Sequence, residues 1–238
     1  MNRFAYYPPI LGYHRVGTFK NDHVPTVSPE VFDRHLAFLT RSGYRIVSLK
    51  ELAECAERCR ACPRRSVAIT FDDGYEEMYS VVRPLLKRFG VPATVFVSTE
   101  EVGGQGFLTW EQTVEMAREG ATIGSHTMHH RYLPLVTGEQ LVQELVGSKQ
   151  VIERHLGHPV EFLSYPVGGF TPEVQRLARQ AGYRAACTTN RLSPSQGAGL
   201  DRFALRRVKV TERDCNLWLF RAKISGYYDL FRQLRQPS

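Results

Sequence analysis

The amino-acid sequence predicts an α/β protein, and three observations point to that class. Short runs rich in β-branched and apolar residues, typical of buried strands, recur along the chain. Segments with apolar residues at helical spacing separate them, and one strand run ends in two adjacent acids, at the edge where α/β folds hold their chemistry. The predicted strands span residues 10–16, 44–47, 66–69, 91–97, 121–123, 161–166, 182–189 and 205–210.

The segments between these runs carry the start signals of helices. Ser28 and Thr171 each precede a proline, which fits the first turn of a helix. Ser48 and Thr109 are each followed three residues later by glutamate or glutamine, the capping-box spacing. Further helices are predicted over residues 76–88 and over residues 141–156, the latter with its charged residues directed outward.

Length and composition fit one domain that spans residues 1–238, with 42% hydrophobic and 23% charged residues. The net charge of +7 is scattered along the chain, so no nucleic-acid partner is expected. The start of the chain lacks an apolar leader region and no run of about 18 apolar residues occurs, which predicts a cytoplasmic protein. The five cysteines, an odd number, are expected to be reduced thiols.

Two adjacent carboxylates, Asp72 and Asp73, close the strand run that begins at Ser66. Neighbouring strand residues point to opposite faces, so the two acids can share one site only where the strand turns, and Gly74 permits that turn. Crowded carboxylates repel unless a cation lies between them, so the pair favours a metal site. The alternative is an ordinary strand-to-helix turn in which Asp73 caps the helix.

Three histidines follow another short strand run within five positions, His126, His129 and His130. A spacing of four predicts that His126 and His130 lie on one side of a helical turn, with Cβ atoms about 5–6 Å apart. Two imidazoles and one carboxylate form a site with open positions, typical of a catalytic metal. A histidine packed in the core is the alternative.

Residues 70–75 (Thr-Phe-Asp-Asp-Gly-Tyr) and 126–130 (His-Thr-Met-His-His) resemble the first two motifs of the polysaccharide deacetylase superfamily, the metal-dependent carbohydrate esterases. The resemblance implies a distorted (β/α) barrel of about seven parallel strands. It also implies that Asp73, His126 and His130 hold one divalent metal ion and that Asp72 is the general base for the metal-bound water. Zinc is the first choice, and nickel, cobalt and iron also tolerate these ligands.

The reaction that this resemblance implies is hydrolysis of N-acetyl groups on an amino sugar, in a polysaccharide, an oligosaccharide or a glycolipid intermediate. Without a leader, an intermediate on a lipid or nucleotide carrier is the expected substrate. Two alternatives stay open: hydrolysis of another amide or imide bond on the same fold, and a non-catalytic carbohydrate-binding relative. The oligomeric state is not predicted.

Two further roles follow from a branch of the superfamily that carries an N-terminal Tyr-His pair, which Tyr13-His14 resembles. In that branch the histidine is the general acid for the leaving amine, and the role is assigned to His14, with a core histidine as the alternative. An arginine on a late strand is the partner of the catalytic aspartate. Arg207 is the candidate, Arg206 is the second choice, and a solvated surface pair is the alternative.

Residues 162–168 resemble the third family motif, whose usual form is Arg-x-Pro-Tyr-Gly, but Ser164 stands at the arginine position and Val167 at the tyrosine position. The backbone N–H of Val167 is the expected oxyanion donor, because a backbone donor survives a change of side chain. Trp110 is expected either to stack on a sugar ring or to pack between helices. The other candidates for substrate contact are Tyr75, Tyr165, Pro166 and Gly168.

Cys55, Cys59 and Cys62 have the spacing of an iron–sulfur or zinc site. Their Arg-rich surroundings instead favour an exposed loop with reduced thiols.

The tail, residues 216–235, alternates aromatic and basic residues. It predicts either a last barrel helix docked on the core, or an amphipathic segment that contacts the inner face of a membrane.

Overall fold

Seven parallel strands of the computed structural model close into a barrel, in the order β1-β10-β9-β8-β7-β6-β5, with β5 pairing back onto β1. The structure describes residues 8–18, 23–58, 62–189 and 201–225. The predicted distorted (β/α) barrel of about seven parallel strands is therefore confirmed. The barrel strands are β1 (Ile10–Tyr13), β5 (Ser66–Phe71), β6 (Thr94–Val97), β7 (Thr122–Ser125), β8 (Phe162–Ser164), β9 (Ala185–Thr188) and β10 (Leu205–Lys209).

The distortion is located at β5. Its first residues, Ser66 and Val67, pair with the short strand β4 (Arg45–Ile46), whereas Thr70 and Phe71 pair with β6. The C-terminal end of β5 therefore pairs with the start of β6, whereas the start of β5 pairs with β4. Two further short strands, β2 (Arg15–Val16) and β3 (Thr26–Val27), form a separate pair beyond β1.

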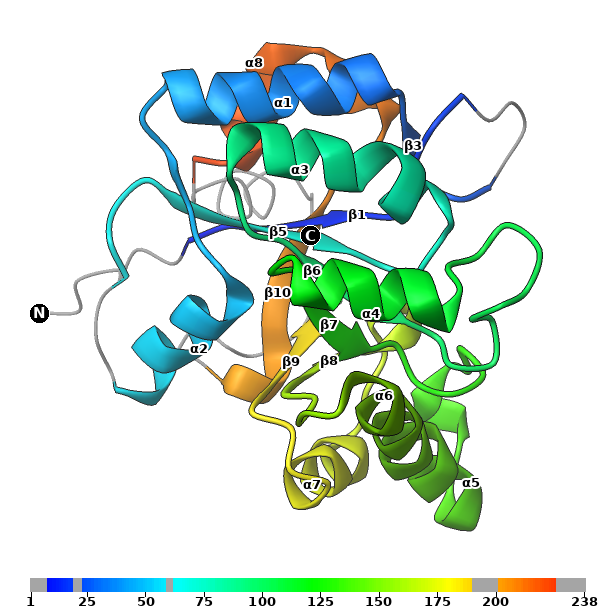
Figure 1. Ribbon diagram of the computed structural model, residues 1–238. Helices are drawn as coiled ribbons and strands as arrows, with labels where there is room; N and C mark the ends of the chain where they lie inside the picture. Colours follow the sequence, from blue (N-terminus) through cyan, green and yellow to red (C-terminus); the bar gives the residue numbers. More distant parts are fainter. Residues whose placement is uncertain (1–7, 19–22, 59–61, 190–200, 226–238) are drawn as a thin grey trace, which may run out of the picture.

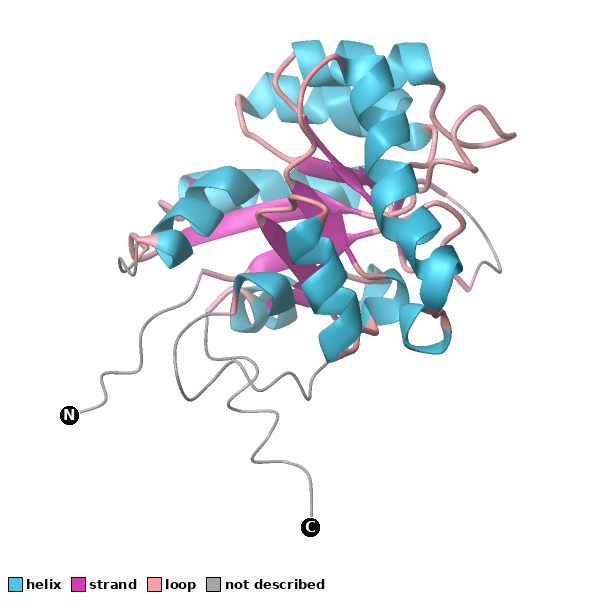
Figure 2. Ribbon diagram, turned by 90° about the horizontal axis from the view of Figure 1, so that it is seen from below, coloured by secondary structure: helices cyan, strands magenta, loops and turns pink. Residues whose placement is uncertain are grey.

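Helices surround the strands, which occupy the centre of the molecule in Figure 2. In Figure 1, α1, α3 and α8 lie on one side of the barrel and α5, α6 and α7 on the opposite side. The predicted caps are present: Ser28 and Thr171 accept backbone N–H groups three residues ahead, and Thr109 forms a capping box with Gln112. The helices are α1 (Pro29–Arg41), α2 (Leu49–Glu57), α3 (Arg83–Phe89), α4 (Trp110–Arg118), α5 (Gly138–Val142), α6 (Ser148–Leu156), α7 (Pro172–Gln180) and α8 (Leu217–Lys223).

Two predicted helices contain π-helical turns, at Met78–Val82 and at Gln143–Gly147. The second turn joins α5 to α6, and it carries Glu144 with its side chain buried. The prediction that the charged residues of this segment face outward is therefore wrong for Glu144. A π-helical turn adds a residue to the helical repeat, and such turns are frequent at functional sites.

The barrel interior is divided into an apolar layer and a polar layer. Inward residues near the strand starts are apolar and form a buried cluster that α2 covers, with Phe96 of β6 and Phe162 of β8 among them. Gly124 of β7 leaves space for Phe96, because a Cβ there would lie 2.5 Å from the Phe96 ring. Strand side chains alternate with a period of two, so the next inward position lies one layer higher. On β10 that position is Arg207, two residues after Leu205 in the apolar layer.

The described part of the tail docks on the barrel as a final helix. Phe220 of α8 is buried and its ring stacks on the imidazole of His35, with ring centroids 3.8 Å apart. Lys223 is also buried, and its ammonium donates to Asp214 at 2.7 Å and to the carbonyl of Lys209 at 2.8 Å. This is the docked alternative, and residues 226–235 of the predicted segment lie outside the described residues. No helix within the described ranges is long and apolar enough to cross a membrane.

The described cysteines, Cys55, Cys62, Cys187 and Cys215, have free thiols, as predicted. Cys62 is buried rather than exposed, because it packs into the apolar cluster at the strand starts that α2 covers. Cys59 lies outside the described residues, so the predicted triplet is not seen as a whole.

The ion pair between Lys223 and Asp214 is expected to stabilise the docked helix. Replacing Lys223 by Ala leaves the buried Asp214 carboxylate without its cation, which should lower the free energy of unfolding by about 3 kcal/mol. Urea denaturation measures this change. Arg221→Ala removes an exposed cation of the same helix and should cost less than about 0.5 kcal/mol; equal losses in both variants would contradict the anchoring role of Lys223.

Candidate active site

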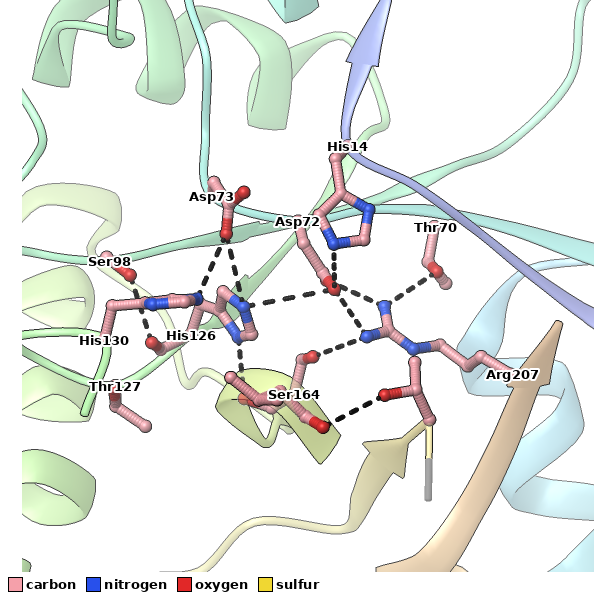
Figure 3. Close-up of polar contacts among 12 residues, drawn as sticks. His14, Thr70, Asp72, Asp73, Ser98, His126, Thr127, His130, Ser164 and Arg207 are labelled. Carbon is pink, nitrogen blue, oxygen red and sulfur yellow. Dashed lines mark hydrogen bonds and ion pairs between the residues drawn. The ribbon is translucent and has the colours of Figure 1, made fainter. Parts of the chain in front are cut away.

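Polar side chains meet at the C-terminal end of the barrel, above its apolar layer (Figure 3). Asp72 and Asp73 follow β5, His14 follows β1, and His126 follows β7. Arg207 reaches the same point from β10. Parallel strands deliver their carboxyl ends to one edge, which is why residues distant in sequence converge here.

Arg207 binds the Asp72 carboxylate through two hydrogen bonds, at 2.7 Å from Nη1 to Oδ1 and 2.5 Å from Nη2 to Oδ2. The same Nη1 and Nη2 groups also donate to the Thr70 hydroxyl at 3.1 Å and to the Ser164 hydroxyl at 2.9 Å. Arg207, and not Arg206, is thus the partner of Asp72. Burial alone would raise the pKa of Asp72, but Arg207 and His126 outweigh it and lower the pKa to about 2. The carboxylate is therefore ionised and held in one orientation.

Asp73, His126 and His130 form a compact set of three ligand atoms, all within 4.8 Å of one another. The Nε2 atoms of both histidines lie 3.4 Å from Asp73 Oδ1. That oxygen is buried yet accepts no hydrogen bond from the described residues. A buried carboxylate oxygen that accepts no hydrogen bond and faces two imidazole nitrogens fits a cation bound by all three groups.

The two histidines converge through an irregular loop, so the predicted helical turn over residues 126–130 is wrong. Thr127 and His130 have φ of 68° and 54° in this loop, and Asp73 has φ of 73° in the opposite one. Residues other than glycine rarely adopt such angles. Gly74 has φ of 77°, so the predicted turn at Gly74 is confirmed, and the left-handed conformation already begins at Asp73, immediately after Asp72. It is what allows the two adjacent acids to face one site.

The imidazole of His126 has a fixed orientation. Its Nδ1–H donates to the carbonyl oxygen of Ser164 at 2.8 Å. Because a carbonyl only accepts, Nδ1 carries a proton, and Nε2 is the ring nitrogen that faces Asp73 and is available to a metal. This is the arrangement of a histidine that ligates a metal.

The local charge also suits a divalent cation. Burial would raise the pKa of Asp73, yet the neighbouring His126 and His130 hold it well below its usual range. Burial lowers the pKa of His126, but Asp72 and Asp73 more than offset this and raise it. Arg207 balances the charge of the buried Asp72, whereas the partly buried Asp73 carboxylate faces the two imidazoles, and a bound cation would balance its charge.

His14 lies at the break between β1 and β2, with Nε2 4.0 Å from Asp72 Oδ2. Burial lowers its pKa, and the nearby carboxylates Asp72 and Asp73 offset this only in part. The imidazole is therefore neutral near pH 7. Figure 3 shows His14 above the Asp72 carboxylate, with Arg207 and His126 approaching the same group from other directions.

The third-motif segment forms a tight turn after β8. Val167 is 73% exposed and has φ of 58°, a strained angle for a β-branched residue. Pro166 and Gly168 are buried on either side of it. Tyr165 is not positioned to touch substrate through its hydroxyl, because the side chain is buried and donates to the Phe203 carbonyl at 3.0 Å.

The two other aromatic candidates are placed differently. The Tyr75 ring lies between Phe107, with ring centroids 5.1 Å apart, and the guanidinium of Arg15, 4.4 Å from the ring centroid. Since Tyr75 follows Asp73 by two residues, it lies at the rim of the site. Trp110 stacks instead on His155 of α6, with ring centroids 4.0 Å apart. Trp110 therefore packs between helices, which is the second of its two predicted roles.

Comparison with known proteins identifies this arrangement. The sequence profile described as polysaccharide deacetylase matches residues 60–186. YxkH of Bacillus subtilis (strain 168), whose name assigns it to the polysaccharide deacetylases, is 34% identical over 203 residues, which cover 85% of this chain and 71% of that protein. The chain belongs to the polysaccharide deacetylase family. The predicted family and hydrolase class are confirmed.

Other relatives of this deacetylase cover smaller parts of it. The peptidoglycan-N-acetylglucosamine deacetylase of Bacillus cereus is 32% identical over 120 residues, 50% of this chain and 54% of that protein. The poly-β-1,6-N-acetyl-D-glucosamine N-deacetylase of Escherichia coli (strain K12) is 30% identical over 123 residues, 45% of this chain but 18% of that protein. Among solved structures, Streptococcus pyogenes deacetylase PplD in complex with acetate aligns with a TM-score of 0.79 at 25% identity, covering 97% of this chain and 98% of that one.

Glu144 is a residue of the deacetylase site region that the sequence analysis missed. Its buried carboxylate accepts the backbone N–H groups of Met128 at 3.0 Å and His129 at 2.9 Å, and Nδ1–H of His129 at 2.8 Å. It therefore fixes the loop between the two histidines of the ligand set. A signal was available, since Glu144 lies three residues after Leu141 and four before Ser148, at the spacing of the buried face of the helix, where an acid is out of place.

Removing Glu144 should weaken metal binding without touching a ligand. In Glu144→Ala the loop loses three hydrogen bonds, and we expect the metal dissociation constant to rise about 10–100-fold, as for other groups that orient metal ligands. Competition with a chromophoric chelator measures it. Glu139→Ala, an exposed glutamate of α5, is the matched control. A lowered melting temperature with unchanged metal affinity would show that Glu144 only supports the fold.

Proposed function

We propose that this chain is a metal-dependent N-deacetylase that hydrolyses acetamido groups of N-acetylglucosamine units in an oligosaccharide or polysaccharide. One observation carries the proposal: an ionised, rigidly held carboxylate, Asp72, lies directly beside the ligand set of Asp73, His126 and His130. Relatives named as deacetylases of peptidoglycan N-acetylglucosamine and of poly-β-1,6-N-acetyl-D-glucosamine support the substrate class. All the groups used here lie on one barrel, which supports a single catalytic domain over residues 1–238.

Asp73, His126 and His130 would hold the metal. A divalent ion bound there supplies Lewis acidity, which makes a water more acidic and polarises the acetyl carbonyl. Two imidazoles and a carboxylate suit zinc first, and also nickel, cobalt or iron. Ser164 contributes through its carbonyl, which fixes the tautomer of His126.

Asp72 accepts the proton of the attacking water. Arg207 occupies both carboxylate oxygens along one edge, which keeps the group ionised and its orientation fixed. A carboxylate with so low a pKa retains a proton only briefly, so the proton has to move on.

His14 is the group that would receive this proton and deliver it to the leaving amine. Since burial keeps its imidazole neutral, His14 needs a proton before it can act as an acid. Asp72 is the nearby source, because His14 Nε2 lies 4.0 Å from Asp72 Oδ2. The backbone N–H of Val167, in the exposed turn after β8, would donate to the acetyl oxygen as negative charge develops on it. The proton of the water thus ends on the amino sugar, and acetate is the second product.

Hydrolysis of another amide or imide bond stays the second candidate function, because the same residues would activate water for either. A non-catalytic carbohydrate-binding role has less support. Asp72 and the complete ligand set are all present and mutually oriented, which binding alone does not require.

Removal of metal should abolish acetate release from N-acetylglucosamine oligomers, and zinc, cobalt or nickel should restore it. Acetate is measured with a coupled enzymatic assay on chelator-treated and reconstituted protein. Asp72→Asn should still bind metal but lose at least about 100-fold in turnover, the contribution of a general base. Acetate release that persists in chelator, or in Asp72→Asn, would contradict the proposal. One bound metal per chain without acetate from any oligomer would favour the second candidate.

Contact of the tail with a membrane surface is a further part of the proposal, supported by Trp218, which is 77% exposed on α8 beside Arg221. An exposed indole beside a cation suits the interface of anionic lipids. Cosedimentation with anionic vesicles should fall about threefold or more in Trp218→Ala, on the scale of one buried aromatic side chain. Binding equal to that of the unsubstituted chain would exclude this contact.

A further inference from the structure

Three exposed apolar side chains lie in the segments beside the candidate active site. Five large hydrophobic residues are exposed in the described part of the chain, and three of them, Tyr132, Leu135 and Val167, belong to the two segments that flank the ligand set. Tyr132 is 46% exposed and Leu135 83% exposed. Exposed aromatic and aliphatic groups that gather at one place mark a surface that binds something.

Tyr132 connects the two flanking segments. It follows the ligand His130 by two residues, and its ring lies against Gly169 in the turn after β8. A Cβ added at Gly169 would overlap the Tyr132 ring at Cε2, so glycine permits this approach. The ring therefore rests on the backbone two residues after Val167, the proposed oxyanion donor.

The position of the ring relates it to the opening of the site. The side chain of His130 is 39% exposed, whereas that of His126 is 2% exposed, so the ligand set is open to solvent on the side of His130. Tyr132 follows His130 by two residues and so lies on this solvent-exposed side of the ligand set. The backbone N–H of Leu135 donates to the Tyr132 carbonyl at 3.1 Å, which extends the same rim as a compact turn.

We propose that Tyr132 is a specificity-determining residue that stacks against the sugar unit next to the one being deacetylated, so that the preferred substrate is an extended glycan. The proposal rests on the proposed deacetylase function. A pyranose ring presents an apolar face of C–H groups, and an aromatic ring held rigidly on one edge offers a matching surface at small entropic cost. An aromatic residue that served only the core would be buried. Here the ring is fixed by Gly169 while nearly half of its surface stays in solvent.

The test compares short and long substrates in Tyr132→Ala, with the N-acetylglucosamine monosaccharide and its oligomers up to the hexamer, in β-1,4 and β-1,6 linkage, as probes. We expect kcat/KM for the hexamer to fall about tenfold, mainly through KM, and kcat/KM for the monosaccharide, which has no neighbouring sugar, to change less than about twofold. Tyr132→Phe keeps the ring and should keep the hexamer preference. Trp218→Ala, which removes an exposed aromatic outside the site, is the matched control.

Two further readouts separate the explanations. Metal affinity, measured by chelator competition, should be unchanged in Tyr132→Ala. A lower metal affinity would show that Tyr132 acts by supporting His130 and would overturn the inference. Hexamer binding by calorimetry should weaken to the same extent as kcat/KM. Equal losses on the monosaccharide and the hexamer, or no loss on either, would also overturn it. If the unsubstituted protein binds hexamer but releases no acetate, the deacetylase proposal fails, and the calorimetric comparison still decides the role of Tyr132.

Discussion

The paired hydrogen bonds between Arg207 and Asp72 are the constraint on which the rest of the site depends. The two residues are 135 positions apart in sequence and lie on strands that each border β1, so their contact requires the barrel to close. The Arg207 side chain passes Gly12 of β1, where a Cβ would lie 3.7 Å from that of the arginine. Removing two charges from water costs several kcal/mol per ion unless geometry and added hydrogen bonds compensate. Thr70 and Ser164 provide those bonds, so the pair fixes the orientation of the Asp72 carboxylate rather than adding stability of its own.

Backbone strain is concentrated around this pair. Five non-glycine residues in the described part of the chain have positive φ, and four of them belong to the site: Asp73, Thr127, His130 and Val167. Each such residue costs about 1–3 kcal/mol and persists only where the surroundings hold it. Glu144 supplies part of that support for the histidine loop. The strain has a geometric use, because it turns consecutive residues toward one point where regular strand or helix geometry would separate them.

Local features of the site were predictable from sequence, and long-range ones were not. Two acids at a strand end and two histidines four apart are visible in short stretches, and so were the strands and the capped helices. The helical turn over residues 126–130 was wrong because spacing does not distinguish a helix from a loop with left-handed residues. Arg207 was found only through a family resemblance, since its role depends on closure of the barrel. Glu144 was missed because a glutamate is usually assigned to solvent, although its spacing from Leu141 placed it on the buried face, where it accepts the backbone N–H groups of Met128 and His129.

Ser164 shows how the site tolerates a change at a motif position that usually carries arginine. The serine at this position is buried and uncharged, so it cannot pair with Asp72. The guanidinium that pairs with Asp72 comes instead from Arg207 on β10 and donates to the serine hydroxyl. The Ser164 hydroxyl accepts from that guanidinium, and its carbonyl, which any residue would provide, orients His126. What the chemistry needs is therefore a cation against Asp72 and an acceptor at His126 Nδ1, and neither is tied to one strand. The same reasoning applies to Val167, where the backbone N–H and its strained angle, not the side chain, are the features that the reaction would use.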